Sequence, residues 1–462
     1  MGTVAGWRLF TVASMLALTV PRLWQRGMFL DGVTYAVVAR NMADGVGTFW
    51  APSFSATTYP QFFEQPPLGL GLQALAFLIF GDHPAVERGY ALAVFGLNAV
   101  CVAALARRLL PAAFDWVPVL VWLVPSVVTW VVVNNMLEGT QALFTSAACL
   151  ALLRTAGPRA PAADAAWAVG AGACIVAATL VKGPVGLFPL SVPLLAPLLP
   201  RERRPARPVL VYGIMVLAVL GAAVCLAACT PSRDALGAFV RTHLAPTLSG
   251  ARGVGPRGVD MMRHVVFGIA LRLGAVVAIV AAVRRRIRLE RRREASFCLL
   301  LGLAASLPVL VSPLLAGHYV FPSTVFFSLA VAAIVVPTEV RDATTVRLRW
   351  LPHALAAVLA VAACATLAIH GPIEARDVDR IRSLRILDPM LPRGATVGAC
   401  RGSATDWGLQ GYVQRVARVS LAADGGAHHA WFLRDKAACE VPRGCVTVAD
   451  SPTLAWLRCA GT

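Results

Sequence analysis

Charged residues are scarce in this sequence. Asp, Glu, Lys and Arg together make up 14% of the chain, while hydrophobic residues make up 58%. So low a polar content excludes an ordinary soluble globule and indicates a helical protein that crosses a membrane several times. Acidic residues are the scarcer charge, since 42 basic residues accompany 24 acidic ones. The basic residues fall in short stretches between apolar segments, which favours contact with anionic lipid over nucleic-acid binding.

Other features are missing as well. No Gly-rich dinucleotide fingerprint and no soluble Rossmann-like segment occur, so nothing indicates a nucleotide-sugar site. No Cys-x-x-Cys pair occurs, which argues against a zinc knuckle. The absence of an internal repeat weakens an inverted-repeat transporter. The first apolar segment lacks a small-residue cleavage site, so we expect it to remain as an anchor.

What the chain does have is long apolar segments. Hydrocarbon requires roughly 20 apolar residues per helix, and backbone groups within lipid must pair internally. The sequence predicts about eleven transmembrane helices, near 7–24, 84–106, 116–133, 137–153, 165–181, 184–200, 208–229, 264–283, 295–313, 318–336 and 351–369. The apolar stretch 68–80 is too short to span, and we expect it to lie along the interface.

The positive-inside rule orients this all-α bundle. Arginines concentrate in alternate linkers, at 107–108, 154–159, 201–207, 284–293 and 341–349. The N-terminus is therefore expected in the cytoplasm, and residues 371–462 are expected on the outer side of the membrane.

Two domains are predicted on this basis. Residues 1–370 form the transmembrane part, and its first outer loop, 25–83, carries two helices on the membrane face, one beginning at Asp31. A second outer loop, 230–263, has a glycine-rich stretch. Residues 371–462 change in composition and predict a small α/β domain. Its four cysteines indicate two disulfides with three pairings open, at Cys400, Cys439, Cys445 and Cys459.

The first outer loop supplies the first candidate site residues. Asp31 is a candidate general base, or simply a helix cap, and Tyr35 lies one turn further along the same face. Glu64 is followed by Gln65 and two prolines, which fix its depth by ending an extended segment. The alternative for Glu64 is an ordinary solvated acid.

Further candidates stand at the ends of membrane segments. Asn135 precedes Glu138, whose carboxylate begins a membrane helix and is costly there unless it is functional. Its alternative role is a favourable charge at a helix N-terminus. Lys182 is one of only two lysines among the 42 basic residues, and a compact charge at that place suits a lipid-linked phosphate. The alternative for Lys182 is snorkelling to the interface.

The remaining candidates are cations and aromatics. Arg272 lies within an apolar segment and must face a polar cavity or a partner, either a phosphate or one of Glu64 and Glu138. His318 and Tyr319 begin the tenth segment on the outer side, as donors to a ligand or as interfacial anchors. Arg40 and Arg88 are further candidates on the outer side, and the alternative for each is a structural role.

These candidates share one predicted location. Asp31, Glu64, Glu138, Lys182 and His318 come from separate parts of the chain, yet all map to the outer end of the bundle. Unrelated caps and anchors would be divided between the two ends. Convergent acids and cations indicate a site for an anionic substrate carried on a lipid.

Several short motifs resemble one known family. They are Asp31 to Ala36, Ala39 to Met42, Glu64 to Leu68, Phe80 to Arg88, Asn134 to Glu138, Lys182 to Pro184 and Gly317 to Tyr319. Their order and spacing over residues 7–336 resemble the bacterial glycosyltransferase family 39, which is related to protein O-mannosyltransferases and to the aminoarabinose transferases of lipid A. The tail is not covered by this resemblance.

The resemblance implies a GT-C fold and transfer of a sugar from a polyprenyl-phosphate carrier to an acceptor on the outer face. It makes Asp31 the catalytic acid or base, matches Glu64 to the acid of the second motif, and places Lys182 and His318 on the donor side. Gly32 and Gln65 depart from the commoner patterns, which leaves the sugar open. The acceptor, a protein, lipid A or an envelope glycan, is open too.

Three further points follow from the residues. Asp31, Glu64 and Glu138 are oxygen ligands of the kind a divalent metal takes, but their scattered positions define no site. A transporter or flippase of lipid-linked sugars would share an outer cationic cavity, yet would also need matching features on the cytoplasmic side. A non-catalytic scaffold would have no use for costly acids at the ends of membrane helices.

Overall fold

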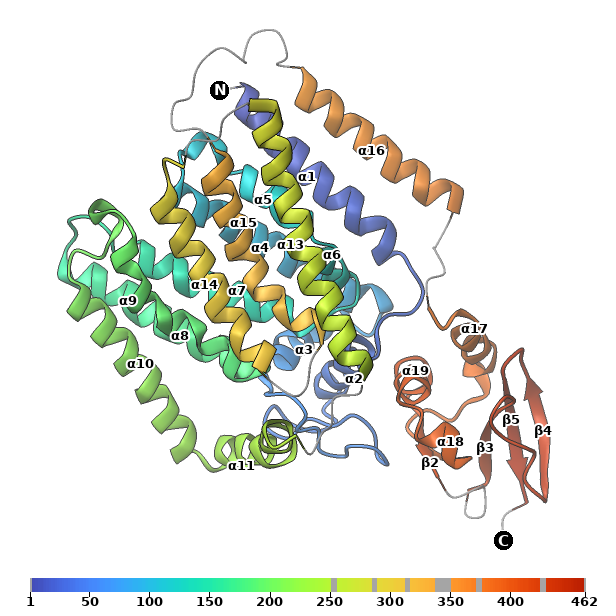
Figure 1. The fold of residues 1–462 in the computed structure, drawn as a ribbon. Coiled ribbons are helices and arrows are strands. Elements are labelled where there is room, and N and C mark those ends of the chain that lie inside the picture. Colours follow the sequence, from blue (N-terminus) through green and yellow to red (C-terminus); the bar gives the residue numbers. More distant parts are fainter. Residues whose placement is uncertain are drawn as a thin grey trace. The chain divides into compact units, whose positions relative to one another are not determined.

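The structure is a computed structural model that describes residues 2–250, 256–284, 289–311, 316–336, 350–370, 376–423 and 429–460. The chain divides into two compact units (Figure 1). The first unit contains residues 1–21, 64–69 and 91–369 and is helical. The second contains residues 22–63, 70–90 and 370–462. The first outer loop, which the sequence assigned to the membrane domain, thus belongs largely to the same unit as the tail.

The helices of the first unit follow the predicted apolar segments. They are α1 (Gly2–Leu23), α4 (Pro84–Leu109), α5 (Val117–Leu123), α6 (Ser126–Val133), α7 (Leu137–Leu153), α8 (Pro161–Lys182), α9 (Val192–Leu195), α10 (Pro208–Ala228), α11 (Thr230–Phe239), α12 (Ala245–Leu248), α13 (Pro256–Arg284), α14 (Arg292–Val311), α15 (Phe321–Val335) and α16 (Leu351–His370).

Within the described residues, seven helices are long and apolar enough to cross a membrane, or eight if the bent pair of α5 and α6 forms one span. The protein is therefore a multi-pass membrane protein. Three predicted spans are not among them. α7 has 17 residues, segment 184–200 is broken into short 3-10 and α pieces, and α14 covers most of 295–313. Prolines at 184, 189, 193 and 197 explain the broken segment, because each removes a backbone donor.

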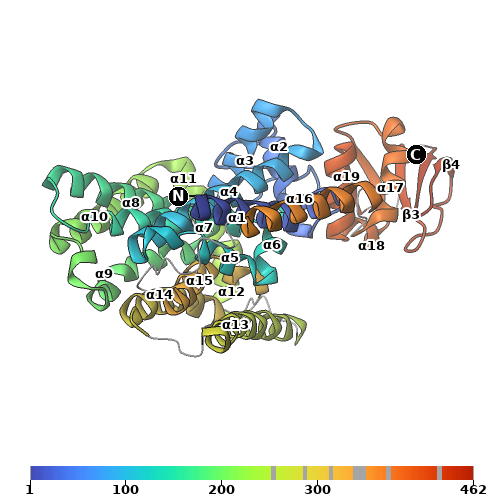
Figure 2. The ribbon, with the colours of Figure 1, turned by 90° about the horizontal axis from the view of Figure 1, so that it is seen from above.

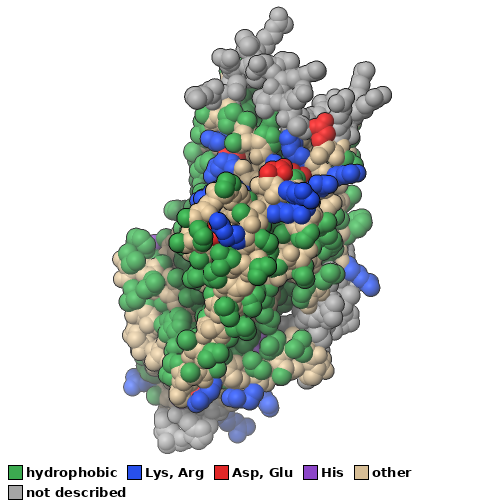
Figure 3. Space-filling view, turned by 90° about the vertical axis from the view of Figure 1, so that its left-hand side faces the viewer, with side chains coloured by type: hydrophobic (Ala, Val, Ile, Leu, Met, Phe, Trp, Pro, Cys, Tyr) green, Lys and Arg blue, Asp and Glu red, His purple; other side chains and the backbone are tan. Residues whose placement is uncertain are grey.

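Packing in this unit separates central from peripheral helices. Most of the helix that includes α15 is buried, whereas α10, α13 and α16 expose most of their apolar surface. On α10, Val209, Leu217 and Val224 are each more than half exposed. Figure 3 shows the face that carries α9 and α10, where hydrophobic side chains cover the middle and basic side chains gather toward the ends. This pattern is that of a surface in contact with hydrocarbon.

The second outer loop contains helices that the sequence did not predict. The segment 230–263 is helical over α11, a π-helical turn at Val240–Leu244 and α12, and α13 already begins at Pro256. Residues 251–255 of the glycine-rich stretch lie outside the described residues, as do the arginines of 341–349 and residues 285–288 of the arginine-rich stretch 284–293.

The second unit combines helices from both ends of the chain with one sheet. Its helices are α2 (Leu30–Ala43), α3 (Leu68–Phe80), α17 (Val378–Leu387), α18 (Arg401–Ala404) and α19 (Trp407–Ala417). The helix predicted from Asp31 is therefore present, but Phe29 is its N-cap residue and Asp31 lies in its first turn. The predicted capping role of Asp31 is wrong.

The tail forms the predicted α/β domain. A five-stranded sheet has the order β2-β1-β3-β5-β4, with β1 parallel to its neighbours and β5 antiparallel to both of its own. The strands are β1 (Thr396–Ala399), β2 (Ser420–Ala422), β3 (Trp431–Asp435), β4 (Cys445–Asp450) and β5 (Leu454–Cys459). Figures 1 and 2 show α17, α18 and α19 gathered on one side of it. Trp456 and Phe432 are buried in its core.

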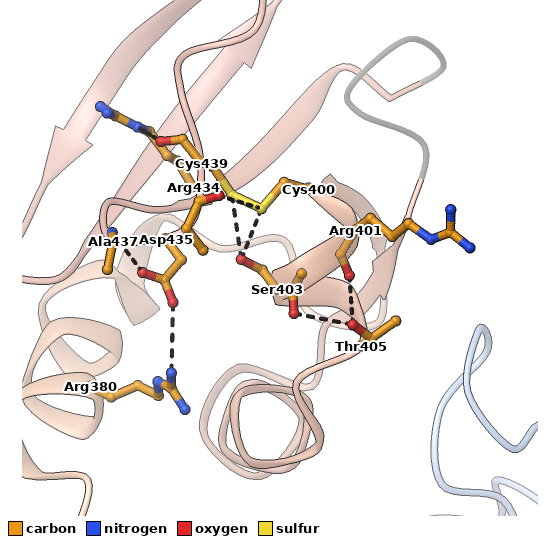
Figure 4. The surroundings of a disulfide bond; sticks show 11 residues. Arg380, Cys400, Arg401, Ser403, Thr405, Arg434, Asp435, Ala437 and Cys439 are labelled. Atoms are coloured by element: carbon orange, nitrogen blue, oxygen red, sulfur yellow. Dashed lines mark hydrogen bonds and ion pairs between the residues drawn. A yellow bond between two sulfur atoms is a disulfide. The ribbon is translucent and has the colours of Figure 1, made fainter.

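Two disulfides join the four cysteines of this domain. Cys445 and Cys459 are register partners on adjacent strands and are bonded to each other. Cys400, at the start of α18, is bonded to Cys439. The hydroxyl of Ser403 lies 3.1 Å from the sulfur of Cys400 and 3.4 Å from that of Cys439 (Figure 4).

Candidate functional site

The end of α8 and the beginning of α7 bring two predicted site residues into contact. Lys182 is the last residue of α8, and Gly183 follows in a positive-φ conformation that turns the chain away. Glu138 lies in the first turn of α7. The Nζ of Lys182 donates a hydrogen bond to Oε1 of Glu138 over 2.5 Å, and the two side chains are 8% and 1% exposed. Burial removes most of the water around the ammonium of Lys182, and the carboxylate of Glu138 compensates its charge.

A third predicted residue completes this buried group. The Nε2 of His318, in the 3-10 turn Gly317–Val320, lies 3.4 Å from the same Oε1 of Glu138. The ring of Tyr319 faces the ammonium of Lys182, with 4.9 Å from Nζ to the ring centroid. Trp130, which the sequence analysis missed, stacks on the imidazole of His318 at 5.4 Å. We call Trp130, Glu138, Lys182, His318 and Tyr319 the lysine cluster.

Neighbouring contacts fix the first turn of α7. Asn98 on α4 donates a hydrogen bond to the carbonyl of Gly139 over 2.9 Å. Gln141 donates to the carbonyl of Ala178, which joins α7 to α8. Asn135 is buried and takes the left-handed conformation, with φ of 53°, that ends α6 and allows α7 to begin. These contacts fix the backbone that carries Glu138.

One oxygen of the lysine cluster is unsatisfied. Within the described residues, Oε2 of Glu138 is buried and has no hydrogen-bond partner. A buried carboxylate oxygen without a donor is costly, and such atoms call for a specific explanation. It can accept a hydrogen bond from a hydroxyl group that enters the cluster.

Glu64 forms a second pair with a residue that the sequence analysis did not single out. Its Oε2 lies 3.0 Å from Nδ1 of His243, and each side chain is 17% exposed. His243 stands in the π-helical turn, where Phe239 stacks on its ring. Such turns occur often at functional sites. The only sequence signal for His243 was its place among the basic residues of segment 230–263.

Close backbone packing links the two groups. A Cβ on Gly183, next to Lys182, would lie 3.3 Å from the ring of Phe239. A Cβ on Gly69, in the segment that follows Glu64, would lie 2.8 Å from Leu137 at the start of α7. Glycines thus allow the Glu64 segment and the π-helical turn to approach the lysine cluster.

Arg272 and Gln65 have more ordinary surroundings. Nη1 of Arg272 donates to the hydroxyl of Ser126 over 2.8 Å, at the first residue of α6, and its side chain is exposed. The sequence analysis considered Glu64 or Glu138 as the partner of Arg272. In the structure Glu64 pairs with His243, and Glu138 pairs with Lys182. Gln65 is half-buried beside Glu64.

The other predicted residues belong to the second unit. Asp31 is half-buried, and Tyr35, one turn along α2, is buried. Arg40 is 1% exposed and donates to the carbonyl of Gln414 and to the side chain of Asn41. Burial lowers the pKa of Arg40 to about 10, against the opposing effect of Asp82.

Arg88 also contacts backbone in this unit. Its Nη2 donates to the carbonyl of Gly27 over 2.6 Å and to that of Gln25 over 3.3 Å. For Arg40 and Arg88 the sequence analysis left a binding role and a structural role open, and the contacts described here are of the structural kind. Among the described residues, no group of three or more His, Cys, Asp or Glu side chains is placed to hold a metal ion.

This arrangement defines the class of the protein. It is a polytopic helical membrane protein with the GT-C fold and a small sheet domain, as the sequence predicted. Over 98% of both chains it resembles the crystal structure of ArnT from Cupriavidus metallidurans bound to undecaprenyl phosphate, with a TM-score of 0.66 and 16% identity. It also resembles the archaeal oligosaccharyltransferase AglB from Archaeoglobus fulgidus, in complex with an inhibitory peptide and a dolichol-phosphate. That match covers 94% of this chain and 69% of AglB, with a TM-score of 0.52 and 12% identity.

The sequence agrees with the fold. Residues 64–227 match the family described as dolichyl-phosphate-mannose-protein mannosyltransferase. No curated protein matches the chain in sequence. The matched region begins at Glu64 and includes Asn135, Glu138 and Lys182.

Proposed function

We propose that this protein transfers a sugar from a polyprenyl-phosphate carrier to an acceptor at the outer face of the bacterial inner membrane. The lysine cluster carries the proposal. When a sugar phosphate ester breaks, negative charge grows on the departing phosphate, and a cation that is already desolvated and oriented stabilises it strongly. Lys182 is such a cation, because Glu138 and the ring of Tyr319 hold it.

The cluster also suits a sugar. The buried Oε2 of Glu138 accepts a hydrogen bond from a sugar hydroxyl, while His318 supplies a further polar group beside Glu138. Asn135, three residues before Glu138 in the chain, is proposed to bind the sugar as well. Trp130 and Tyr319 offer aromatic faces at the same place. On this proposal Lys182 binds the phosphate and Glu138 orients the sugar. Arg272, with its exposed guanidinium, and Gln65 complete the donor side.

The acceptor side rests on Asp31 and Glu64. A hydroxyl or phosphate acceptor attacks more readily when a carboxylate takes its proton, and Asp31 has that role in the family that its surrounding motif resembles. Tyr35, Arg40 and Arg88 are proposed to support it. Glu64 is the second proposed acid, oriented by His243. A divalent metal at these oxygens stays a hypothesis without a defined site.

Relatives with this fold support the choice of donor. ArnT was crystallised with undecaprenyl phosphate and AglB with dolichol-phosphate, and both are lipids of the polyprenyl-phosphate type. The membrane orientation follows the arginine distribution, with the N-terminus in the cytoplasm and the tail in the periplasm.

The test uses purified full-length protein in liposomes with radiolabelled polyprenyl-phosphate sugars and a crude envelope acceptor fraction. Lys182→Gln keeps a polar side chain, shorter by one atom, and removes its charge. We expect turnover to fall by about a hundredfold or more, the usual loss when an oriented donor to a developing anion is removed. Asp31→Asn should abolish transfer while donor binding is retained. The matched control is Asp234→Asn, because Asp234 is 67% exposed on α11 and pairs with the exposed Arg233.

Two outcomes would overturn the proposal. One is turnover of Asp31→Asn and Lys182→Gln equal to that of Asp234→Asn. The other is movement of the labelled lipid between leaflets without any transfer, which would favour a flippase.

A further inference from the structure

The segment that leads to Asp31 is held by residues more than three hundred positions later in the chain. The hydroxyl of Tyr412, on α19, accepts a hydrogen bond from the amide of Met28 over 3.2 Å. It lies 3.0 Å from the carbonyl oxygen of Met28 and 3.1 Å from a carboxylate oxygen of Asp377, either of which accepts its proton. Tyr412 is 4% exposed. A single side chain therefore binds both polar backbone groups of the residue three positions before Asp31.

The same helix packs directly against the beginning of α2. A Cβ on Gly408 would lie 3.0 Å from the side chain of Leu30, and a Cβ on Gly411 would lie 3.0 Å from that of Val33. Leu30 and Val33 flank Asp31. A larger side chain at either glycine would push α2 away. Because glycine has no Cβ, α19 and α2 can approach this closely.

The start of α2 lacks the usual capping side chain. Helices are usually started by Ser, Thr, Asp or Asn at the N-cap, whose side chain binds a backbone amide. Here the N-cap is Phe29, which has no oxygen for that purpose. Gly27 has φ of 79°, and a Cβ there would overlap the carbonyl oxygen of Arg376. Long-range contacts therefore replace the missing cap.

We infer that α19 is a positioning element for Asp31 and that Tyr412 is its principal positioning residue. The inference rests on the proposed function, in which Asp31 takes the proton of the acceptor. A catalytic group must be held within a fraction of an ångström, since a displacement of about 1 Å costs roughly a hundredfold in rate. The tail thus supports catalysis through the backbone of residues 27–33, in addition to any contact that it makes with the acceptor.

The first test compares Tyr412→Phe with Tyr212→Phe in the full-length protein. Tyr212, on α10, is a matched control because its hydroxyl is buried and has no hydrogen-bond partner among the described residues. Hydrogen exchange is measured for residues 27–35, together with kcat and KM for the lipid-linked donor. Tyr412→Phe is expected to speed exchange at Met28 and in the first turn of α2. It should also lower kcat by about tenfold or more with an unchanged donor KM.

A double variant shows whether the effect passes through Asp31. In an Asp31→Glu background, which keeps a displaced carboxylate and measurable turnover, Tyr412→Phe should cost far less turnover than in the wild type, because the group that it positions is already out of place. A merely structural role would lower turnover equally in both backgrounds, and this result would overturn the inference. So would a kcat within twofold of Tyr212→Phe, or an altered donor KM with an unchanged kcat.

A second substitution keeps the inference testable if Tyr412→Phe does not fold. Gly411→Ala moves Val33 by a few tenths of an ångström and leaves the Tyr412 hydroxyl in place. Its control is Gly402→Ala in α18, where an added Cβ meets nothing within 4 Å. Gly411→Ala should lower kcat relative to Gly402→Ala, and equal values would contradict the inference. If the wild type transfers no sugar at all, the proposed function fails, while the exchange measurement still decides whether Tyr412 holds residues 27–33.

Discussion

Lys182 and Glu138 are bonded to each other over 2.5 Å, so that the last residue of α8 is fixed to the first turn of α7. The contact explains why one of the two lysines of this arginine-rich chain stands there. An ammonium is compact and fits between a carboxylate and the ring of Tyr319, whereas the planar fork of an arginine is larger and binds differently.

Stability should depend on this pair. Lys182→Met leaves the Glu138 carboxylate buried beside His318 without its cation, and breaking a buried pair in this way costs about 3–5 kcal/mol. Adding Glu138→Gln should recover part of the loss. Lys436→Met is the matched control, because the other lysine pairs with Asp450 at the surface of the tail, where such pairs contribute about 0–1 kcal/mol. Thermal unfolding in detergent measures all four proteins, and equal losses for the two lysine variants would contradict the burial argument.

Glu64 should act together with His243. Glu64→Gln keeps a hydrogen bond to the imidazole but removes the negative charge, so we expect kcat to fall by about a hundredfold, the lower end for loss of a general acid or base. His243→Ala should produce a similar fall, and the double variant should be no worse than either single one. Steady-state assays with saturating donor provide the measurement. Additive losses would show that the two residues act independently.

Acid should destabilise the second unit through Asp82. Burial by itself would raise the pKa of Asp82, but Arg415, with Arg418 and Arg40, brings it below its ordinary value of 3.8. A folded-state pKa below the unfolded one means that the ion pairs stabilise fully above about pH 4 and are lost as pH falls through the lower, folded value. Hydrogen exchange in α19 should therefore accelerate only at strongly acidic pH.

Substitution of Asp82 separates this effect from general acid unfolding. Asp82→Asn should accelerate exchange in α19 at neutral pH and flatten its dependence between pH 5 and pH 2. Asp379→Asn is the control, because Asp379 is 71% exposed and pairs with Arg382 at the surface. A pH dependence in Asp82→Asn as steep as that of the control would show that another carboxyl group is responsible.

The two disulfides should stabilise the tail unequally. Cys400–Cys439 closes 39 residues and Cys445–Cys459 closes 14. In the chain-entropy account, loops of these lengths contribute about 4 and about 3 kcal/mol respectively. Replacing the first pair by serines should therefore lower stability more than replacing the second. Thermal unfolding without reductant tests the order, and mass spectrometry of unreduced peptides checks the pairing.

Long apolar segments made most of the fold predictable. A membrane helix needs its hydrophobic residues in one stretch, so α1, α4, α8, α10, α13 and α16 could be recognised from composition alone. Segment 184–200 was equally apolar, but its five prolines break it, since apolar composition does not guarantee a continuous helix. The helices within segment 230–263 were not predicted, because they are short and carry charges.

The site was predictable in part. Glu138, Lys182 and His318 stood out because charged or titratable groups at the ends of apolar helices are unusual, and the structure brings these three together. Their pairing could not be read from the sequence, because it depends on how α7, α8 and the turn at 317–320 pack. His243 and Trp130 were missed for the same reason: each is ordinary in its own segment and significant only beside Glu64 or His318.

The division of the second unit among distant parts of the chain has a consequence for its biosynthesis. Residues 22–63 and 70–90 leave the ribosome early, but the partners of Met28, Arg40 and Asp82 lie on α19 and are made hundreds of residues later. The unit cannot be completed until the tail has been synthesised and delivered to the same side of the membrane. On the proposed function, a chain arrested before residue 400 would therefore contain Asp31 and the whole lysine cluster and still transfer no sugar.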